Sequence, residues 1–580
     1  MRERLLTQHF LQRFLENDLV SPDADRHDAI AMVCGGLLAL ALFVSILISL
    51  KFLFMPFPSP GRTADLAIYD RFFFIASAMI VMALVAVITW DALSLDPRDT
   101  AILGSLPIPQ AVIVRAKLRA IAIVAGGFAL TISALSSVFH PTLMVARLPI
   151  GVVPALTLIA VHLVITIGAG LFAFASIVVL RELLRAALGV RFTRVSAPVQ
   201  ALLIVAVITS FLLLPAILTR ATQGGSEARL WPPVWFLGLH ETLAGRLVTE
   251  LPPPDLPTRI KPLEERAAAR YRENAARLRP LAWRAVAAFM GSLLLAVGGY
   301  YWNSRQLPLP LVGGRASKYR APGILSRATR WTIIRAPASQ AGFFLTLHCL
   351  FRSAPHRVVL AGCTALSLAI SILLLAAVSR AVARDASAVP AWAFSTQTTA
   401  LMIMLAGVRH IMRLPADLRG NRLFRLAWLG NTQAFLAGVR RAAVISIVVP
   451  VVIVLLPANL YLLGEQRALM HTLSGLLLGI AFLSFMTFNA TQLPFVASYA
   501  PTADLNTIGP AVLVGGLFAI SIFARIEAFA LTDLSAAAAF WGALVAGALV
   551  PRFTSDRSSR LDLPTAFDVP APGATRLDLG

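Results

Sequence analysis

Side chains with chemical potential are few in this sequence, and none has the spacing that a known reaction needs. The stretch 313–318 (GGRASK) superficially resembles a phosphate-binding loop, but it lacks the Gly-x-x-x-x-Gly-Lys-Ser/Thr spacing. There is no His-Glu-x-x-His zinc motif and no Gly-x-Ser-x-Gly nucleophile turn. The 3 cysteines have neither metal-ligand nor disulfide spacing. We therefore predict that the chain is not an enzyme and uses no cofactor or metal.

Polar side chains inside long apolar segments are the remaining candidates. A charge at the centre of a bilayer costs about 2.5–3.5 kcal/mol, so charges found there usually have a function. The carboxylates of these segments fall near their ends, which argues against an ion-coupled carrier: Asp91, Glu182, Glu527 and Asp533. Four polar groups are expected at depth, where hydrogen bonding between helices is favoured over substrate contact: His162, Asn459, Asn489 and Gln492.

The elements that hold these groups are apolar segments long enough to cross a membrane. Of the 580 residues 58% are hydrophobic and 14% are charged, against about 25% charged in soluble domains. About 20 apolar residues span a bilayer as a helix, because lipid offers no partner for free backbone groups. The sequence predicts an all-α, polytopic integral membrane protein with about twelve transmembrane helices: 29–54, 72–89, 118–139, 150–180, 198–218, 283–302, 358–378, 392–408, 442–463, 469–492, 508–523 and 531–550.

The distribution of Arg and Lys predicts the orientation of the chain. With the N-terminus in the cytoplasm, the basic connections after the second, fourth, sixth and eighth spans all face the cytoplasm, as the positive-inside rule requires. The basic outer loop 219–282 is long enough to escape that rule. The formal charge of +22 thus reflects membrane topology. We expect contact with the lipid bilayer and none with nucleic acid, since no recognition motif accompanies the charge.

The spans divide into two halves of six. We predict an amphipathic N-terminal helix in the cytoplasm (1–28), a first half (29–302), a basic cytoplasmic linker (303–357), a second half (358–550) and a loosely ordered tail (551–580). Leucine and phenylalanine at helical spacing in 5–19, and again in 339–352, predict a helix lying in the membrane surface before each half. Because six is even, the two halves share one orientation and form a parallel repeat.

A charged segment follows the second span of each half, at 90–120 and at 413–443. The stretch DPRDTAIL (96–103), then SLPI (105–108) and RAKL (115–118), resembles the signature after the second span of type-2 ABC exporter permeases. In the second half, LRGNRLFR (418–425), QLPFVASY (492–499) and RSAPHR (352–357) resemble the C-terminal part of large, poorly characterised bacterial permease-like proteins.

This resemblance implies a fused permease in a bacterial inner membrane, driven by a separate ABC-type ATPase subunit. In that family the segment between the second and third spans is a coupling helix that docks on the ATPase. The residues it would place there are Asp96, Arg98, Asp99, Ile102, Leu103, Arg419 and Arg422. An ion-coupled secondary transporter and a non-transport membrane scaffold are the alternatives, and the substrate is not predicted.

Overall fold

The protein folds as two compact helical units, residues 1–314 (unit 1) and 315–580 (unit 2), each described by itself. In this computed structural model the described residues are 2–15, 26–55, 59–94, 103, 106, 108–146, 148, 150–222, 227–245, 247, 257–305, 336–384, 389–416, 424, 431–487, 493–496 and 505–558. No strand occurs among them, so the described part of the chain is all-α.

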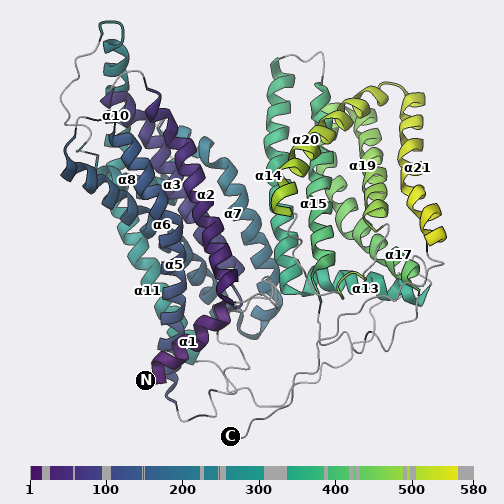
Figure 1. The fold of residues 1–580 in the computed structure, drawn as a ribbon, viewed down its shortest axis with the longest axis horizontal. Coiled ribbons are helices and arrows are strands. Elements are labelled where there is room, and N and C mark those ends of the chain that lie inside the picture. Colours follow the sequence, from purple (N-terminus) through teal and green to yellow (C-terminus); the bar gives the residue numbers. More distant parts are fainter. Residues whose placement is uncertain are drawn as a thin grey trace. The chain divides into compact units, whose positions relative to one another are not determined.

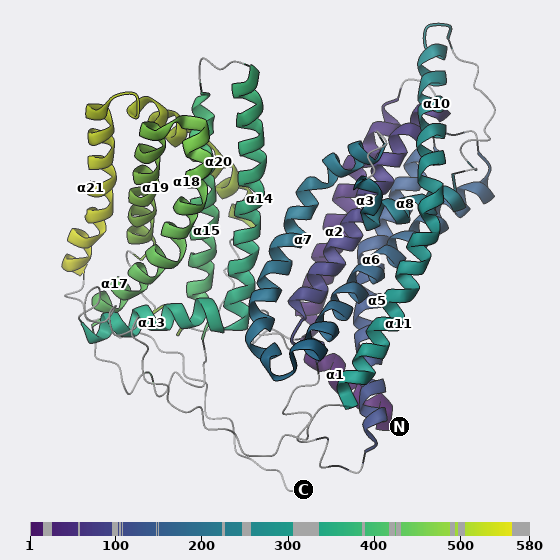
Figure 2. The same cartoon turned by 180° about the vertical axis from the view of Figure 1, so that it is seen from behind.

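Unit 1 contains long helices and a small group of shorter ones (Figures 1 and 2). Its helices are α1 (Arg2–Leu15), α2 (Arg26–Leu53), α3 (Pro60–Ile88), α5 (Gln110–Val145), α6 (Val152–Leu188), α7 (Phe192–Thr222), α8 (Pro232–Leu243), α10 (Lys261–Leu278) and α11 (Ala282–Arg305). Helices α3 and α6 form its centre, with α5, α7, α8 and α11 packed around them.

Unit 2 follows a similar order of elements. Its helices are α13 (Pro337–Arg352), α14 (Ala354–Arg384), α15 (Ser395–Arg413), α17 (Thr432–Ala443), α18 (Val449–Leu463), α19 (Glu465–Met486), α20 (Leu505–Ala530) and α21 (Leu534–Ser558). A π-helical turn, Val444–Val448, joins α17 to α18.

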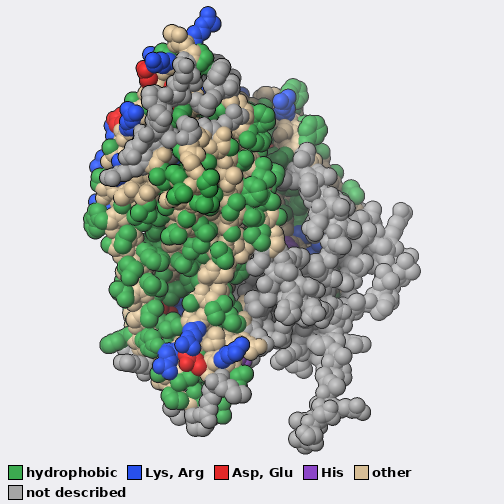
Figure 3. Space-filling model, turned by 60° about the vertical axis from the view of Figure 1, so that its left-hand side comes forward, with side chains coloured by type: hydrophobic (Ala, Val, Ile, Leu, Met, Phe, Trp, Pro, Cys, Tyr) green, Lys and Arg blue, Asp and Glu red, His purple; other side chains and the backbone are tan. Residues whose placement is uncertain are grey.

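The chain is a multi-pass membrane protein. Within the described residues, 9 helices are long and apolar enough to cross a membrane. Their outward-facing side chains are apolar: Phe43 is 65% exposed, Val164 65% and Leu294 68%. The face of unit 1 in Figure 3 carries an apolar zone with charged side chains gathered toward its two ends. Such a surface suits lipid between two aqueous boundaries.

Every segment expected to span the membrane overlaps a helix, but the second one begins much earlier than expected. We expected that span at 72–89, whereas α3 begins at Pro60. Asp65, Asp70 and Arg71 are therefore buried inside the helix. Glu264 of α10 accepts hydrogen bonds from the first backbone N–H groups of α3, those of Gly61 and Arg62, and so satisfies donors that a helix start leaves free.

Helix α10 packs against the beginning of α3 and holds it in place. Its buried residues recur at helical spacing on one face: Ala267, Tyr271, Ala275 and Leu278. The opposite face is charged and exposed. One charged group, Arg270, reaches α3 and forms an ion pair with Asp65 at 2.9 Å.

The two amphipathic helices pack against protein. We expected their apolar faces to lie in the membrane surface. Instead Phe10 and Phe14 of α1 are buried against α5, where Lys117 lies over both rings at 4.9 and 4.4 Å from their centroids. In unit 2, α13 packs on α17 and buries Phe343 and Leu350. Each helix thus lies against the start of the third long helix of its unit.

Candidate functional site

Most residues predicted to contact an ATPase lie outside the described part of the chain. These are Asp96, Arg98, Asp99, Ile102, Arg419 and Arg422. Leu103 is described, is partly exposed, and its carbonyl accepts a hydrogen bond from the Leu106 N–H at 3.3 Å. Of the polar groups expected at depth, Asn489 and Gln492 also fall outside the described residues, whereas His162 and Asn459 are described and buried.

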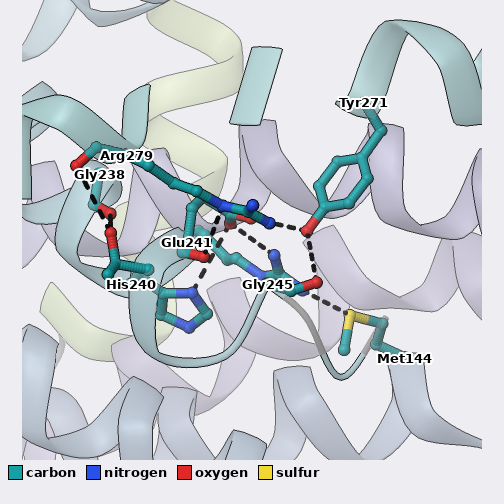
Figure 4. A network of polar contacts seen from close by, with 9 residues as sticks. Met144, Gly238, His240, Glu241, Gly245, Tyr271 and Arg279 are labelled. Atoms are coloured by element: carbon teal, nitrogen blue, oxygen red, sulfur yellow. Dashed lines mark hydrogen bonds and ion pairs between the residues drawn. The ribbon is translucent and has the colours of Figure 1, made fainter. Parts of the chain in front are cut away.

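The most concentrated polar chemistry in unit 1 is a buried ion pair between α3 and α8. Arg71 Nη1 lies 2.7 Å from Glu241 Oε1, and the two side chains are 2% and 0% exposed. The hydroxyl of Tyr271, from α10, donates to the other carboxylate oxygen at 2.6 Å. Met144 Sδ lies 3.5 Å from Arg71 Nη2. In Figure 4 the Tyr271 hydroxyl and the Glu241 carboxylate, which come from separate helices, point toward one another.

A second ion pair lies where α2 and α3 meet. Lys51 Nζ contacts Asp70 Oδ1 at 2.5 Å. The lysine side chain is 38% exposed and the aspartate side chain 5%, so this ion pair extends from the buried site to the surface of unit 1. The other oxygen of Asp70 lies 3.9 Å from His140 Nδ1 on α5, which is too long for a hydrogen bond. Ser49 Oγ lies within hydrogen-bonding distance of that nitrogen, at 3.1 Å.

Three buried histidines, which we call the histidine column, lie between the two ion pairs. The ring centroids of His140 and His162 are 5.6 Å apart, and those of His162 and His240 are also 5.6 Å apart. All three side chains are 1% exposed. Phe74 packs edge-on against His162 at 5.9 Å and tilted against His140 at 5.1 Å. Six elements of unit 1 thus contribute to one buried polar site.

Four ring nitrogens of the column lack a hydrogen-bond partner among the described residues: His140 Nε2, His162 Nδ1, His162 Nε2 and His240 Nδ1. The expectation that His162 would bond a neighbouring helix is therefore not met. A buried polar atom without a partner costs about 1–3 kcal/mol. Buried polar atoms of this kind are normally hydrogen-bonded to water or to a ligand.

The charge of Arg71 governs the electrostatics of α8. Burial by itself would raise the pKa of the Glu241 carboxyl, but Arg71 opposes this, and with His240 and Tyr271 it lowers that pKa to about 2. Burial lowers the pKa of His240, which lies 3.7 Å from Glu241 Oε1. Glu241 is thus ionised, and His240 is neutral. Within the described residues no group of three or more His, Cys, Asp or Glu is placed to hold a metal ion.

Unit 2 has a smaller buried polar cluster of its own. His471 Nδ1 of α19 lies 2.7 Å from Glu527 Oε1 of α20, and both side chains are 1% exposed. Gln397 of α15 donates to the His471 carbonyl at 2.7 Å. The side-chain oxygen of Gln397 accepts a hydrogen bond from Asn459 of α18 at 3.3 Å, which meets the expectation of interhelical hydrogen bonding for that asparagine. Glu527 was expected near a span end, and it lies close to the end of α20.

Other buried charge lies at the opposite end of α6. Arg181 Nη1 contacts Glu182 Oε1 at 2.5 Å, and Asn303 of α11 donates to Glu182 Oε2 at 2.7 Å. The guanidinium of Arg181 stacks on Trp90 at 5.8 Å. These contacts tie α6 to α11 and satisfy the charges locally.

Comparison with known proteins gives no family assignment. No family model, no curated protein and no solved structure matches this chain.

Proposed function

We propose that this chain is the membrane-spanning permease subunit of a transporter, energised by a separate ABC-type ATPase. It would lie in a bacterial inner membrane with its N-terminus in the cytoplasm. Twelve spans would form two parallel halves of six. The absence of a nucleotide-binding motif from the sequence fits a division of labour in which the partner hydrolyses ATP.

Support for two parallel halves comes from helix pairs that recur in the same order. The packing of α1 on α5 has its counterpart in α13 on α17. Likewise α3 packs on α6 and α7, and α15 packs on α19 and α20. The last helix of each unit, α11 or α21, packs on α6 or α19. A chain that repeats six spans keeps the same orientation in both copies.

The observation that carries the proposal is the packing of the helix that follows each predicted coupling segment in the sequence. In unit 1 the segment 96–103 precedes α5, whose first turns hold α1 through Lys117 and through the ion pair of Arg119 Nη1 with Glu3 Oε1 at 2.9 Å. In unit 2 the segment around 419–422 precedes α17, which packs closely on α13. A coupling element must transmit force between two sites. A helix whose first turns are packed against a second helix is rigid enough to do so.

Charge reversal in the first coupling segment should release the ATPase. We expect Arg98→Glu combined with Asp99→Arg to reduce co-purification of a Walker-motif ATPase at least tenfold, because charge-matched docking becomes repulsive. Insertion into the membrane should be unchanged. Arg147→Glu is the control, because Arg147 falls in a predicted outer connection, and it should retain the ATPase. The readout is mass spectrometry of affinity-purified complexes at matched expression.

Two outcomes would contradict the proposal. One is that no ATPase co-purifies with the native protein from its source membrane. The other is that the double charge reversal retains as much ATPase as the native chain.

The buried ionisable side chains of unit 1 favour a second candidate, an ion-coupled carrier. Charged groups within membrane segments often line ion or proton pathways. This candidate predicts uptake or export that collapses with the proton gradient and persists without ATP. A membrane scaffold without transport would show neither dependence.

A further inference from the structure

The histidine column runs beside two ion pairs whose α3 members, Asp70 and Arg71, are consecutive residues. At one end Lys51 and Asp70 reach a partly exposed position. At the other end Glu241 is bound by Arg71 and Tyr271. Between them stand three imidazoles whose consecutive centroids are 5.6 Å apart. Nothing in the ATP-driven scheme above requires an ionisable path of this kind inside unit 1.

Packing alone does not account for this arrangement. A buried imidazole placed only to fill space would be replaced at lower cost by an apolar ring, as at the neighbouring Phe74 and Phe52. Both nitrogens of His162 are instead buried without a partner among the described residues. A metal is not an adequate explanation either, because no described group of ligands converges on one point. Water molecules or mobile protons are the occupants that suit a line of imidazoles.

We propose that the histidine column is a proton relay, with His162 as its central carrier, through which protons exchange between Asp70 and His240. The inference goes beyond the proposed permease role and does not depend on the ATPase. Its ligand is the proton itself, carried by imidazole rings and by water bridging them. Gaps longer than a direct hydrogen bond are commonly bridged by one water.

Each transfer conserves protons. A neutral imidazole accepts a proton on its bare nitrogen and releases the proton held by its other nitrogen. One proton arriving at His140 from Asp70 therefore allows one to leave toward His162, and His162 passes one to His240 in the same way. The number of N–H bonds on each ring is unchanged and its tautomer is inverted, so a return transfer or a ring turn resets the column.

The surrounding charges favour neutral imidazoles between transfers. The titratable and charged groups that face the column come from α2, α3, α8, α10 and the turn before α11: Lys51, Asp70, Arg71, Glu241, Tyr271 and Arg279. Each carboxylate is paired with a cation, Asp70 with Lys51 and Glu241 with Arg71. The three cations outnumber the two carboxylates, which disfavours a further positive charge on an imidazole, and a proton can still move along the rings by tautomer exchange without leaving a permanent buried charge.

Nitrogen NMR of the full-length chain tests the relay. The protein is labelled with ¹⁵N at histidine and reconstituted in lipid bilayers, and the His162 signals are assigned by their loss in His162→Phe. Rapid proton transfer should merge the two ring nitrogens of His162 into averaged signals, whereas a static neutral ring gives one protonated and one bare nitrogen. Should His162→Phe fail to fold, His162→Gln serves the same assignment, since glutamine can hydrogen-bond.

Variants of α3 supply the discriminating comparison. Asp70→Asn removes the carboxylate that exchanges protons with His140, and we expect it to restore two separate His162 signals. Asp65→Asn is the matched control, because Asp65 pairs with Arg270 outside the column, and averaging should persist there. Ser49→Ala, which removes the other partner of His140 Nδ1, is the second variant should Asp70→Asn fail to fold.

Two separate His162 signals in the native chain would overturn the relay. So would averaging that survives unchanged in Asp70→Asn, because protons would then not enter through that carboxylate.

Discussion

Arg71→Met should destabilise the protein by about 3–5 kcal/mol, the usual cost of removing one partner from a buried ion pair. The variant leaves the Glu241 carboxylate buried with the Tyr271 hydroxyl but without a cation. Most of the loss should be recovered in the double variant Arg71→Met with Glu241→Gln, because no unpaired charge then remains buried. Thermal unfolding in detergent, followed by tryptophan fluorescence, measures both differences against the native chain.

The neighbouring ion pair between Arg270 and Asp65 is the matched control. Arg270, like Arg71, forms an ion pair with a carboxylate where another helix packs on α3, but its side chain is 65% exposed. Exposed ion pairs contribute about 0–1 kcal/mol to stability, so Arg270→Met should shift the midpoint of thermal unfolding little. Equal losses for Arg71→Met and Arg270→Met would show that the buried pair does not hold α3 to α8.

The loss of stability caused by Arg71→Met should also depend on pH. In the folded protein the pKa of Glu241 is lowered to about 2, from an ordinary value of 4.5. A carboxyl whose pKa is lower in the folded state stabilises the protein above 4.5 and loses that contribution as the pH falls toward 2. The difference in the free energy of unfolding between the native chain and Arg71→Met should therefore be largest near neutral pH and should become smaller below about pH 4.5. A difference that grows in acid would contradict the pairing.

Gly438→Ala should separate α13 from α17. A methyl group at this position would overlap the carbonyl oxygen of Ser339 and would lie 2.9 Å from the backbone nitrogen of Phe343. Both neighbours are backbone atoms, so no side-chain rotation relieves the clash. Alanine is otherwise the better helix residue by about 1 kcal/mol. We nevertheless expect a net loss of about 1–3 kcal/mol, the range for overpacked sites, measured as a lower thermal midpoint.

Gly362→Ala on α14 is the control for that substitution. A methyl group there meets nothing within 4 Å, so only the helix preference of alanine acts, and stability should stay equal or rise slightly. A stable Gly438→Ala protein would mean that α13 is not held against α17 by close backbone contact.

The long apolar helices could be predicted from the sequence because hydropathy reports the one property that lipid selects. The start of α3 could not be predicted in the same way. The run from Pro60 to Arg71 contains Asp65, Asp70 and Arg71, and charged residues read as a connection between spans. They lie inside the helix because α2, α8 and α10 supply their partners, and a window of hydropathy contains no information about such partners.

The polar site of unit 1 was missed for a related reason. Its members come from residues as distant as Lys51 and Tyr271, so no short motif brings them together. His162 alone was singled out, because a histidine deep in an apolar segment is conspicuous. His140 and His240 stand near helix ends, and Glu241 was assigned to an outer loop. The signal that could have pointed to them is the coincidence of several histidines with a carboxylate at the same end of successive helices.

The parallel arrangement of the halves is the central claim, since only that arrangement presents both coupling segments to one ATPase. Cysteine accessibility tests it directly. Single cysteines, Asp99→Cys or Arg422→Cys, are introduced in a background without the three native cysteines. Both should react with a membrane-impermeant maleimide only after the cells are opened. Ser226→Cys, in the predicted outer loop, should react in intact cells. Labelling of position 99 or 422 from outside would contradict the parallel halves and, with them, the docking of a shared ATPase.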